Sequence, residues 1–220
     1  MPGYQTKTES IVVGGADTIV RSLLDRQQFS DPQGDASRSG ISSANWPLFG
    51  LVWPSALVLA AHMQQIDLAE RQVLEVGCGL ALASLVVHRR EGFVTASDHH
   101  PLTESFLIEN VRLNGLAPLR YAQGDWATAN PSLGRFDLIV GSDVLYDRAQ
   151  PAQLAAFIEL HANPTAEVII VDPDRGNRPA FNRAMSASGF VLTEQKITAL
   201  PGSGLPYKGR VLSYRRVGTH

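Results

Sequence analysis

The chain has 220 residues, of which 44% are hydrophobic and 18% are charged, and its formal net charge at pH 7 is -2. This is the composition of one globular domain, or of one domain with a short extension, that can bury a core. The charge gives no electrostatic basis for a nucleic-acid partner, and one cysteine, Cys78, excludes an internal disulfide framework and a cysteine-rich zinc site.

The first residues of the chain lack the basic and apolar regions of a signal peptide. No uncharged apolar run reaches the length that spans a membrane. We therefore expect a cytoplasmic protein without a membrane partner, and no pattern in the sequence indicates its oligomeric state.

The N-terminal segment predicts a hairpin followed by a loop. Residues 10–20 alternate loosely around Gly14-Gly15, a good two-residue turn, and residues 30–45 are rich in Ser, Asp, Gly and Pro. Pro54 then suits the first turn of a helix that has an apolar face over residues 56–63. We expect residues 1–45 to form an N-terminal extension and residues 46–220 to form the main domain.

From Arg71 onward, strand patterns alternate with helix patterns. The predicted strands are 73–76, 93–97, 119–122, 136–141, 167–171, 190–197 and 210–216, and the predicted helices are 80–90, 102–113, 149–161 and 178–188. The last two strands have no helix between them and should pair as an antiparallel hairpin. The pattern predicts an α/β, Rossmann-like, doubly wound fold, with a mainly parallel seven-stranded sheet and helices on both faces.

A glycine turn follows the first strand of this sheet. Gly77 and Gly79, on either side of Cys78, allow a sharp turn and a close approach to a ligand. Glu75 stands at the carboxyl end of the strand, where we expect no structural need for an acid. Leu82 replaces the third glycine of a dinucleotide fingerprint, so the turn suits S-adenosylmethionine better than NAD.

Polar side chains follow the later strands as well, at the edge where open α/β sheets bind ligands. Those we expect at the site are Asp98, Asp125, Trp126, Ser142, Asp143 and Tyr146; Asp172, Asp174 and Arg175 follow the fifth strand. Alternatives stand beside these predictions. Asp98 or Asp143 could cap the next helix, Trp126 or Tyr146 could pack in the core, and Cys78 could be a small filler. His99-His100 has no second cluster with metal-ligand spacing, so we predict no metal site.

Together these motifs resemble the class I S-adenosylmethionine-dependent methyltransferases, and within them the family 16 seven-β-strand protein lysine methyltransferases. The resemblance rests on Glu75-x-Gly77-x-Gly79, Asp98, Asp125-Trp126, Asp143-x-x-Tyr146 and the tryptophan-bearing segment around Trp53. The chain departs from the better-known eukaryotic members at Pro54, where they usually carry an acid, and in the loop of residues 172–177.

The resemblance implies that S-adenosylmethionine is held by Trp53, Glu75, the turn of residues 77–79, Asp98, Asp125, Trp126 and Ser142. It implies that Asp143 and Tyr146 orient a lysine amine of a protein acceptor. We also expect residues 29–49 and 173–179 to border the acceptor entrance. A small-molecule N- or O-methyltransferase is the alternative function. A non-catalytic cofactor-binding protein and an NAD-dependent oxidoreductase are less favoured.

Overall fold

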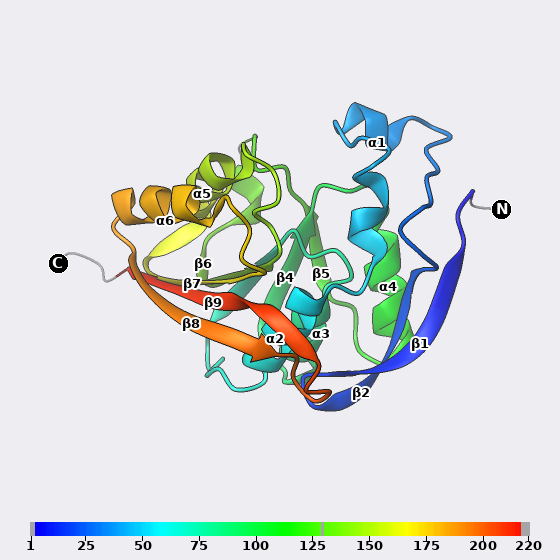
Figure 1. Ribbon diagram of the computed structural model, residues 1–220, viewed down its shortest axis with the longest axis horizontal. Coiled ribbons are helices and arrows are strands. Elements are labelled where there is room, and N and C mark those ends of the chain that lie inside the picture. Colours follow the sequence, from blue (N-terminus) through cyan, green and yellow to red (C-terminus); the bar gives the residue numbers. More distant parts are fainter. Residues whose placement is uncertain (1–2, 129, 217–220) are drawn as a thin grey trace.

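The computed structural model describes residues 3–128 and 130–216, and within them the predicted α/β architecture is confirmed (Figure 1). Seven strands form one sheet in the order β5-β4-β3-β6-β7-β9-β8. The strands are β3 (Gln72–Val76), β4 (Phe93–Asp98), β5 (Arg120–Gln123), β6 (Phe136–Ser142), β7 (Ala162–Asp172), β8 (Val191–Ala199) and β9 (Pro206–Arg216). The strands from β5 to β7 run parallel, while β9 pairs antiparallel with both β7 and β8. The C-terminal hairpin is thus confirmed.

Helices cover both faces of the sheet, and the central strands β3 and β6 are mostly buried for that reason. On one face lie α2 (Pro54–Met63), α3 (Leu82–Arg89) and α4 (Thr103–Leu113), and on the other lie α5 (Gln150–His161) and α6 (Arg178–Ala187). Successive strand residues point to opposite faces. Leu138 and Val140 of β6 accordingly join the α2–α4 core, while Ile139 between them joins the α5–α6 core.

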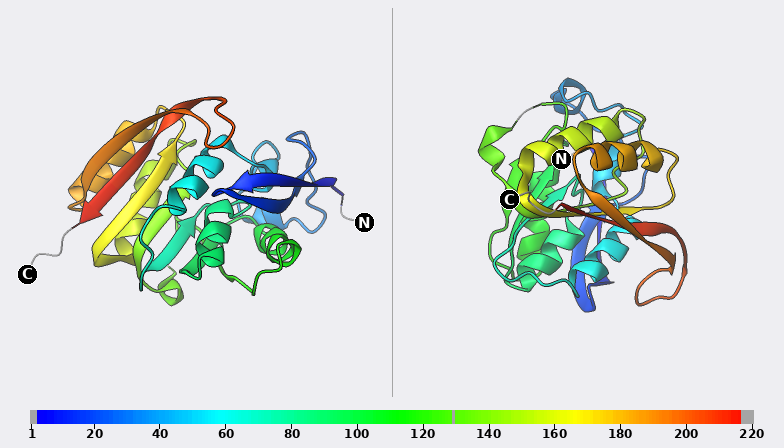
Figure 2. Two further views of the ribbon diagram at one scale, coloured as in Figure 1. Left: turned by 90° about the horizontal axis from the view of Figure 1, so that it is seen from below. Right: turned by 90° about the vertical axis from the view of Figure 1, so that its left-hand side faces the viewer.

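The N-terminal hairpin consists of β1 (Thr6–Val13) and β2 (Ala16–Leu23), which form a separate antiparallel pair. Gly14 and Gly15 at its turn both have positive φ, as the predicted two-residue turn requires. The side-chain amides of Asn110 on α4 and of Asn114 just after it hydrogen-bond to the backbone of β2. Figure 2 shows this hairpin at the opposite end of the molecule from β8 and β9.

Several predicted boundaries were wrong; the predicted strand 210–216, for example, begins earlier, at Pro206 in β9. The predicted loop 30–45 contains a one-turn helix, α1 (Asp35–Arg38), because the Asp31 carboxylate accepts the backbone N–H groups of Ala36 and Ser37. The predicted strand 167–171 begins earlier, at Ala162 in β7. Short 3₁₀ helices, η1 (Trp46–Gly50) and η2 (Pro131–Leu133), complete the described elements. None of the helices in the described ranges is long and apolar enough to cross a membrane. The division of the chain at residue 45 stays a prediction.

Candidate functional site

A cavity of about 720 Å³ lies where β3 and β6 end side by side. These strands meet at the point where the strand order reverses, so the chain leaves them in opposite directions and opens a crevice there. The volume is in the range of small-molecule sites. The predicted site residues that line it are Trp53, Gly77, Cys78, Gly79, Asp98, Asp125, Trp126, Ser142, Asp143 and Tyr146.

The glycine turn forms the floor of this cavity. Gly77 and Gly79 have φ values of 56° and 52°, in the left-handed region that favours glycine. A Cβ at Gly77 would lie 2.9 Å from a Val144 methyl group, and one at Gly79 would lie 2.9 Å from the Phe49 carbonyl oxygen. Glycine is therefore required at both positions, by the backbone conformation and by the atoms that lie against it.

Asp98 links the ends of β3 and β4. Its side chain is buried, and its two oxygens accept the backbone N–H groups of Gly79 and His100, both at 2.9 Å. No side chain caps α4, so the structure does not support the alternative in which Asp98 caps that helix. The carboxylate keeps free lone pairs at the cavity wall, where ribose hydroxyls could donate to it.

Glu75 does not line the cavity. One carboxylate oxygen accepts the backbone N–H of Ser84 at 2.7 Å and its hydroxyl at 2.5 Å, which ties β3 to the first turn of α3. The expectation that nothing structural requires an acid here was therefore wrong. Burial raises the pKa of Glu75 to about 7, although the bonds from Ser84 oppose the shift. Its contact with a cofactor stays a prediction.

Glu75 should make the folded state less stable as the pH rises toward neutrality. Its folded pKa of about 7 exceeds the ordinary value of 4.5. The native state therefore binds more protons between these values, and the free energy of unfolding falls across this window. In Glu75→Gln this fall should be smaller, as urea unfolding at pH 5 and pH 7.5 can measure. If the free energy of unfolding depended on pH in the same way in both proteins, the raised pKa of Glu75 would be contradicted.

Aromatic and acidic side chains close the rim of the cavity. Trp126 lies against the glycine turn, with ring atoms 3.3 Å from where a Gly77 Cβ would stand. The Trp53 indole N–H donates to the Leu48 carbonyl at 2.8 Å, which fixes its ring before α2 begins. Asp125 accepts the backbone N–H of Ala127 through one oxygen and also lines the cavity. Trp126 thus faces the cavity as well as packing on the turn.

Asp143 and Tyr146 stand beyond the end of β6, whereas Asp98 stands at the end of β4. Asp143 has a φ of 54°, and its backbone N–H donates to Val171 of β7. Asp147, not Asp143, accepts the N–H of Ala149 at the start of α5, so the structure does not support a helix-capping role for Asp143. Tyr146 is partly exposed at the cavity wall, and burial raises the pKa of its phenol.

Arg175 completes this part of the site; from the sequence it was placed after the fifth strand and within the expected entrance segment 173–179, but no partner was predicted for it. Its Nε and Nη2 donate to the two oxygens of Asp143 at 2.7 and 2.8 Å. The two residues are 32 positions apart in the chain, so no local sequence pattern indicates that they pair. The polar residues after β7 were the available signal.

His100 was considered in the sequence only as a metal ligand. Its ring instead stacks on Phe49, with centroids 3.8 Å apart, and its Nδ1 accepts the Leu102 N–H. Burial lowers the pKa of His100 to about 3, so the ring is neutral. Among the described residues there is no group of three side chains that could hold a metal. The predicted border segments contribute Gly40, Ile41 and Asn45 to the cavity, beside Arg175.

The fold is shared with solved structures of methyltransferases. A 16S rRNA N2 G1207 methyltransferase from T. thermophilus superposes with a TM-score of 0.65 and 16% identity, over 97% of this chain and 51% of that one. A ribosomal protein L11 methylase from Lactobacillus delbrueckii gives a TM-score of 0.59 at 20% identity, over 74% and 79%. At these identities the likeness concerns the fold alone.

Comparison of sequences identifies the family to which the chain belongs. The profile of the family described as lysine methyltransferase matches residues 45–183, more than half of the chain. The chain belongs to this family, which confirms the predicted resemblance. The protein N-lysine methyltransferase METTL21A of Danio rerio is 29% identical over 140 residues, which cover 58% of this chain. The match spans 63% of that relative's own length, just under two thirds.

Proposed function

We propose that this protein transfers a methyl group from S-adenosylmethionine to a lysine nitrogen of a protein acceptor. The observation that carries the proposal is the meeting of the glycine turn, Asp98 and the Asp143-x-x-Tyr146 motif at one cavity, in a chain of the lysine methyltransferase family. The METTL21A relative, an N-lysine methyltransferase by name, supports the choice of acceptor.

The residues present fit this cofactor. Gly77 and Gly79 line the cavity without side chains of their own, and the Asp98 carboxylate offers acceptors for ribose hydroxyls. Trp126 and Asp125 suit an adenine ring and its amino group, and Trp53 and Ser142 close the remaining wall. When bound, the cofactor supplies a methyl group on an activated, positively charged sulfur.

The protein then has little chemistry to perform beyond positioning and the exclusion of water. Asp143 and Tyr146 hold the acceptor nitrogen by hydrogen bonds, so that its lone pair faces the turn of residues 77–79. That nitrogen must lose a proton, which passes to solvent water. The cytoplasmic location expected from the sequence is part of the same proposal.

Calorimetry with S-adenosylhomocysteine and with NAD tests the cofactor. We expect S-adenosylhomocysteine to bind and NAD not to bind, because Leu82 at the start of α3 takes the place of the third dinucleotide glycine. Incubating cell lysate with enzyme and labelled S-adenosylmethionine then shows whether label enters a lysine of a protein. Binding of NAD alone would overturn the proposal.

Asp98→Ala should weaken the binding of S-adenosylhomocysteine by about 1–3 kcal/mol, the scale of lost hydrogen bonds to a charged group. The change also releases the Gly79 N–H, so the turn loses the partner that orders it. Asp67→Ala is the matched control, because Asp67 also accepts a backbone N–H, that of Ala69, but is not among the residues that line the cavity. Unchanged affinity in Asp98→Ala would remove Asp98 from the site.

A small-molecule N- or O-acceptor is the second candidate. The pairing of Asp143 with Arg175 favours it, because a neutralised carboxylate attracts a lysine ammonium less strongly. Label found only in small molecules in the lysate experiment would select this candidate.

A further inference from the structure

The ion pair between Asp143 and Arg175 determines the charge of the site where the acceptor would bind. Both side chains line the cavity together with Tyr146 and the glycine turn. The Asp143 side chain is 12% exposed and that of Arg175 is 41% exposed, so the carboxylate is sheltered and the guanidinium stands at the mouth. Two parallel hydrogen bonds give the planar geometry that suits an arginine–carboxylate pair.

The loop after β7 holds Arg175 in place from both sides. Before it, Asp172 accepts the Arg175 backbone N–H at 2.8 Å. After it, the Asn177 amide donates to the Leu145 carbonyl at 2.9 Å. The guanidinium therefore reaches Asp143 from a fixed backbone.

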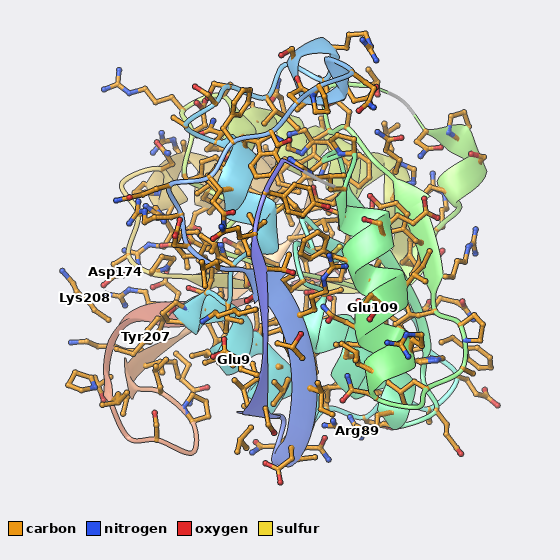
Figure 3. All side chains as sticks on the ribbon, turned by 90° about the vertical axis from the view of Figure 1, so that its right-hand side faces the viewer. Glu9, Arg89, Glu109, Asp174, Tyr207 and Lys208 are labelled. Carbon is orange, nitrogen blue, oxygen red and sulfur yellow. The ribbon has the colours of Figure 1, made fainter. Side chains whose placement is uncertain are left out.

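Asp174, the residue before Arg175, is anchored separately. Its carboxylate accepts from Arg178 at 2.7 Å and from Arg210 of β9 at 3.0 Å. Figure 3 shows Asp174 beside Tyr207 and Lys208 at this corner of the molecule. Arg178 and Arg210 already donate hydrogen bonds to the Asp174 carboxylate. Arg175 therefore pairs with Asp143.

This pairing changes which protonation state of an incoming nitrogen the site binds better. A sheltered carboxylate alone would stabilise an ammonium and raise its pKa, which opposes the loss of the proton that methylation requires. The hydrogen bonds to Asp143 raise the pKa of Arg175, so the guanidinium stays charged and cancels the carboxylate. A neutral pair does not offset the cost of stripping water from an ammonium.

We propose that Arg175 is a positioning residue that makes the acceptor site take an uncharged nitrogen in preference to an ammonium. The inference rests on the proposed function, and it deepens it. Asp143 retains oxygen lone pairs that can accept an N–H from a neutral amine, and Tyr146 offers a hydroxyl beside it. The lone pair of that nitrogen is then left free for the methyl group.

Sinefungin tests this without knowledge of the acceptor. In sinefungin a carbon that bears a primary amine replaces the methyl-bearing sulfur of S-adenosylmethionine, so the amine takes the place of the methyl group, whereas S-adenosylhomocysteine has a sulfur that bears no such group. The affinity of each ligand is measured by calorimetry between pH 7.5 and 9.5, and their ratio is followed. The titratable and charged groups that interact with the pair or with its neighbours Tyr146 and Tyr207 are Asp98, Asp147, Asp172 and Asp174. They are common to both complexes and largely cancel in the ratio.

In the wild-type protein the affinity of sinefungin relative to S-adenosylhomocysteine should rise with pH. The rise should approach roughly tenfold per pH unit below the amine's own pKa of about 10, because only the neutral amine is accepted. In Arg175→Met the ratio at pH 7.5 should be at least about tenfold higher, and it should no longer rise with pH, because the uncovered carboxylate takes the ammonium.

Two further variants separate charge from structure. Arg175→Lys keeps a cation and should keep the wild-type rise. Arg112→Met removes an arginine from a similar two-bond pair with Glu109 on the surface of α4, and should also behave as wild type. Should Arg175→Met fail to fold, Arg175→Gln serves in its place.

A wild-type ratio that does not change with pH would overturn the inference, as would an equal rise in Arg175→Met. Either result leaves the cofactor proposal standing, because both ligands still bind. Failure of S-adenosylhomocysteine to bind at all would overturn the proposed function and this inference with it.

Discussion

Gly79→Ala is expected to abolish measurable binding of S-adenosylhomocysteine and to lower the free energy of unfolding by about 2–4 kcal/mol. Gly79 has a φ of 52°, which an L side chain adopts at a cost. The added Cβ would also lie 2.9 Å from the carbonyl oxygen of Phe49, a backbone atom that cannot rotate away. The segment around Phe49 or the turn itself must then move, and the cavity changes shape.

Gly115→Ala is the matched control for this substitution. Gly115 follows α4 with a φ of 63°, so alanine meets the same backbone cost, but nothing lies within 4 Å of the new Cβ. It should lose stability by about 1–2 kcal/mol and bind S-adenosylhomocysteine normally. Thermal unfolding and calorimetry on the two variants separate the backbone cost from the steric one. Normal binding in Gly79→Ala would show that the turn does not approach the ligand.

The fold could be predicted because each of its signals is local. Strand and helix periods, Gly14-Gly15 and the glycine turn at Gly77 are set by neighbouring residues, and the structure has each of them near its predicted place, although strands β7 and β9 begin earlier than predicted. The position of β9 between β7 and β8 is different, because it depends on which edge the hairpin joins. Nothing in the spacing of the last two strands specifies that order.

The residues that gather at the site could also be predicted, but their side-chain partners could not. Parallel strands bring their carboxyl ends to one edge, so Asp98, Asp125 and Asp143 could be expected to gather there, and all three line the cavity. Side-chain pairing across elements could not be foreseen. Glu75 turns to Ser84 inside the protein, and Asp143 meets Arg175 from another loop, because packing between elements decides these contacts.

The loop of residues 172–177 departs from the better-known members of the family, and the structure shows which side chain of this loop reaches the site. In this chain the loop supplies Arg175 to the ion pair with Asp143, and the proposal above assigns this pair to the acceptor end of the cavity. The two ends of the site can therefore be tested apart. Substitutions at Asp98 or Gly79 should act on cofactor binding, whereas substitutions at Asp143 or Tyr146 should act on transfer.

Asp143→Asn and Tyr146→Phe should each slow methyl transfer by about 10²-fold, the scale of a lost orienting group, and leave the affinity for S-adenosylhomocysteine nearly intact. Both side chains stand on the segment after β6 and line the cavity. The amide introduced by Asp143→Asn would offer a nitrogen in place of one acceptor oxygen. It would also leave Arg175 without a counter-charge, so the incoming nitrogen is held less well.

The measurement is single-turnover transfer to the acceptor that the lysate labelling identifies, with calorimetry on the same variants. Tyr4→Phe is a suitable control for the loss of a hydroxyl, because Tyr4 packs near Trp46 and does not line the cavity. Full activity in both variants would mean that the motif only shapes the segment before α5. Equal losses of binding and transfer would instead move Asp143 and Tyr146 into the cofactor pocket. A loss confined to transfer would assign them to the acceptor, because the two ligands share the cavity but not these contacts.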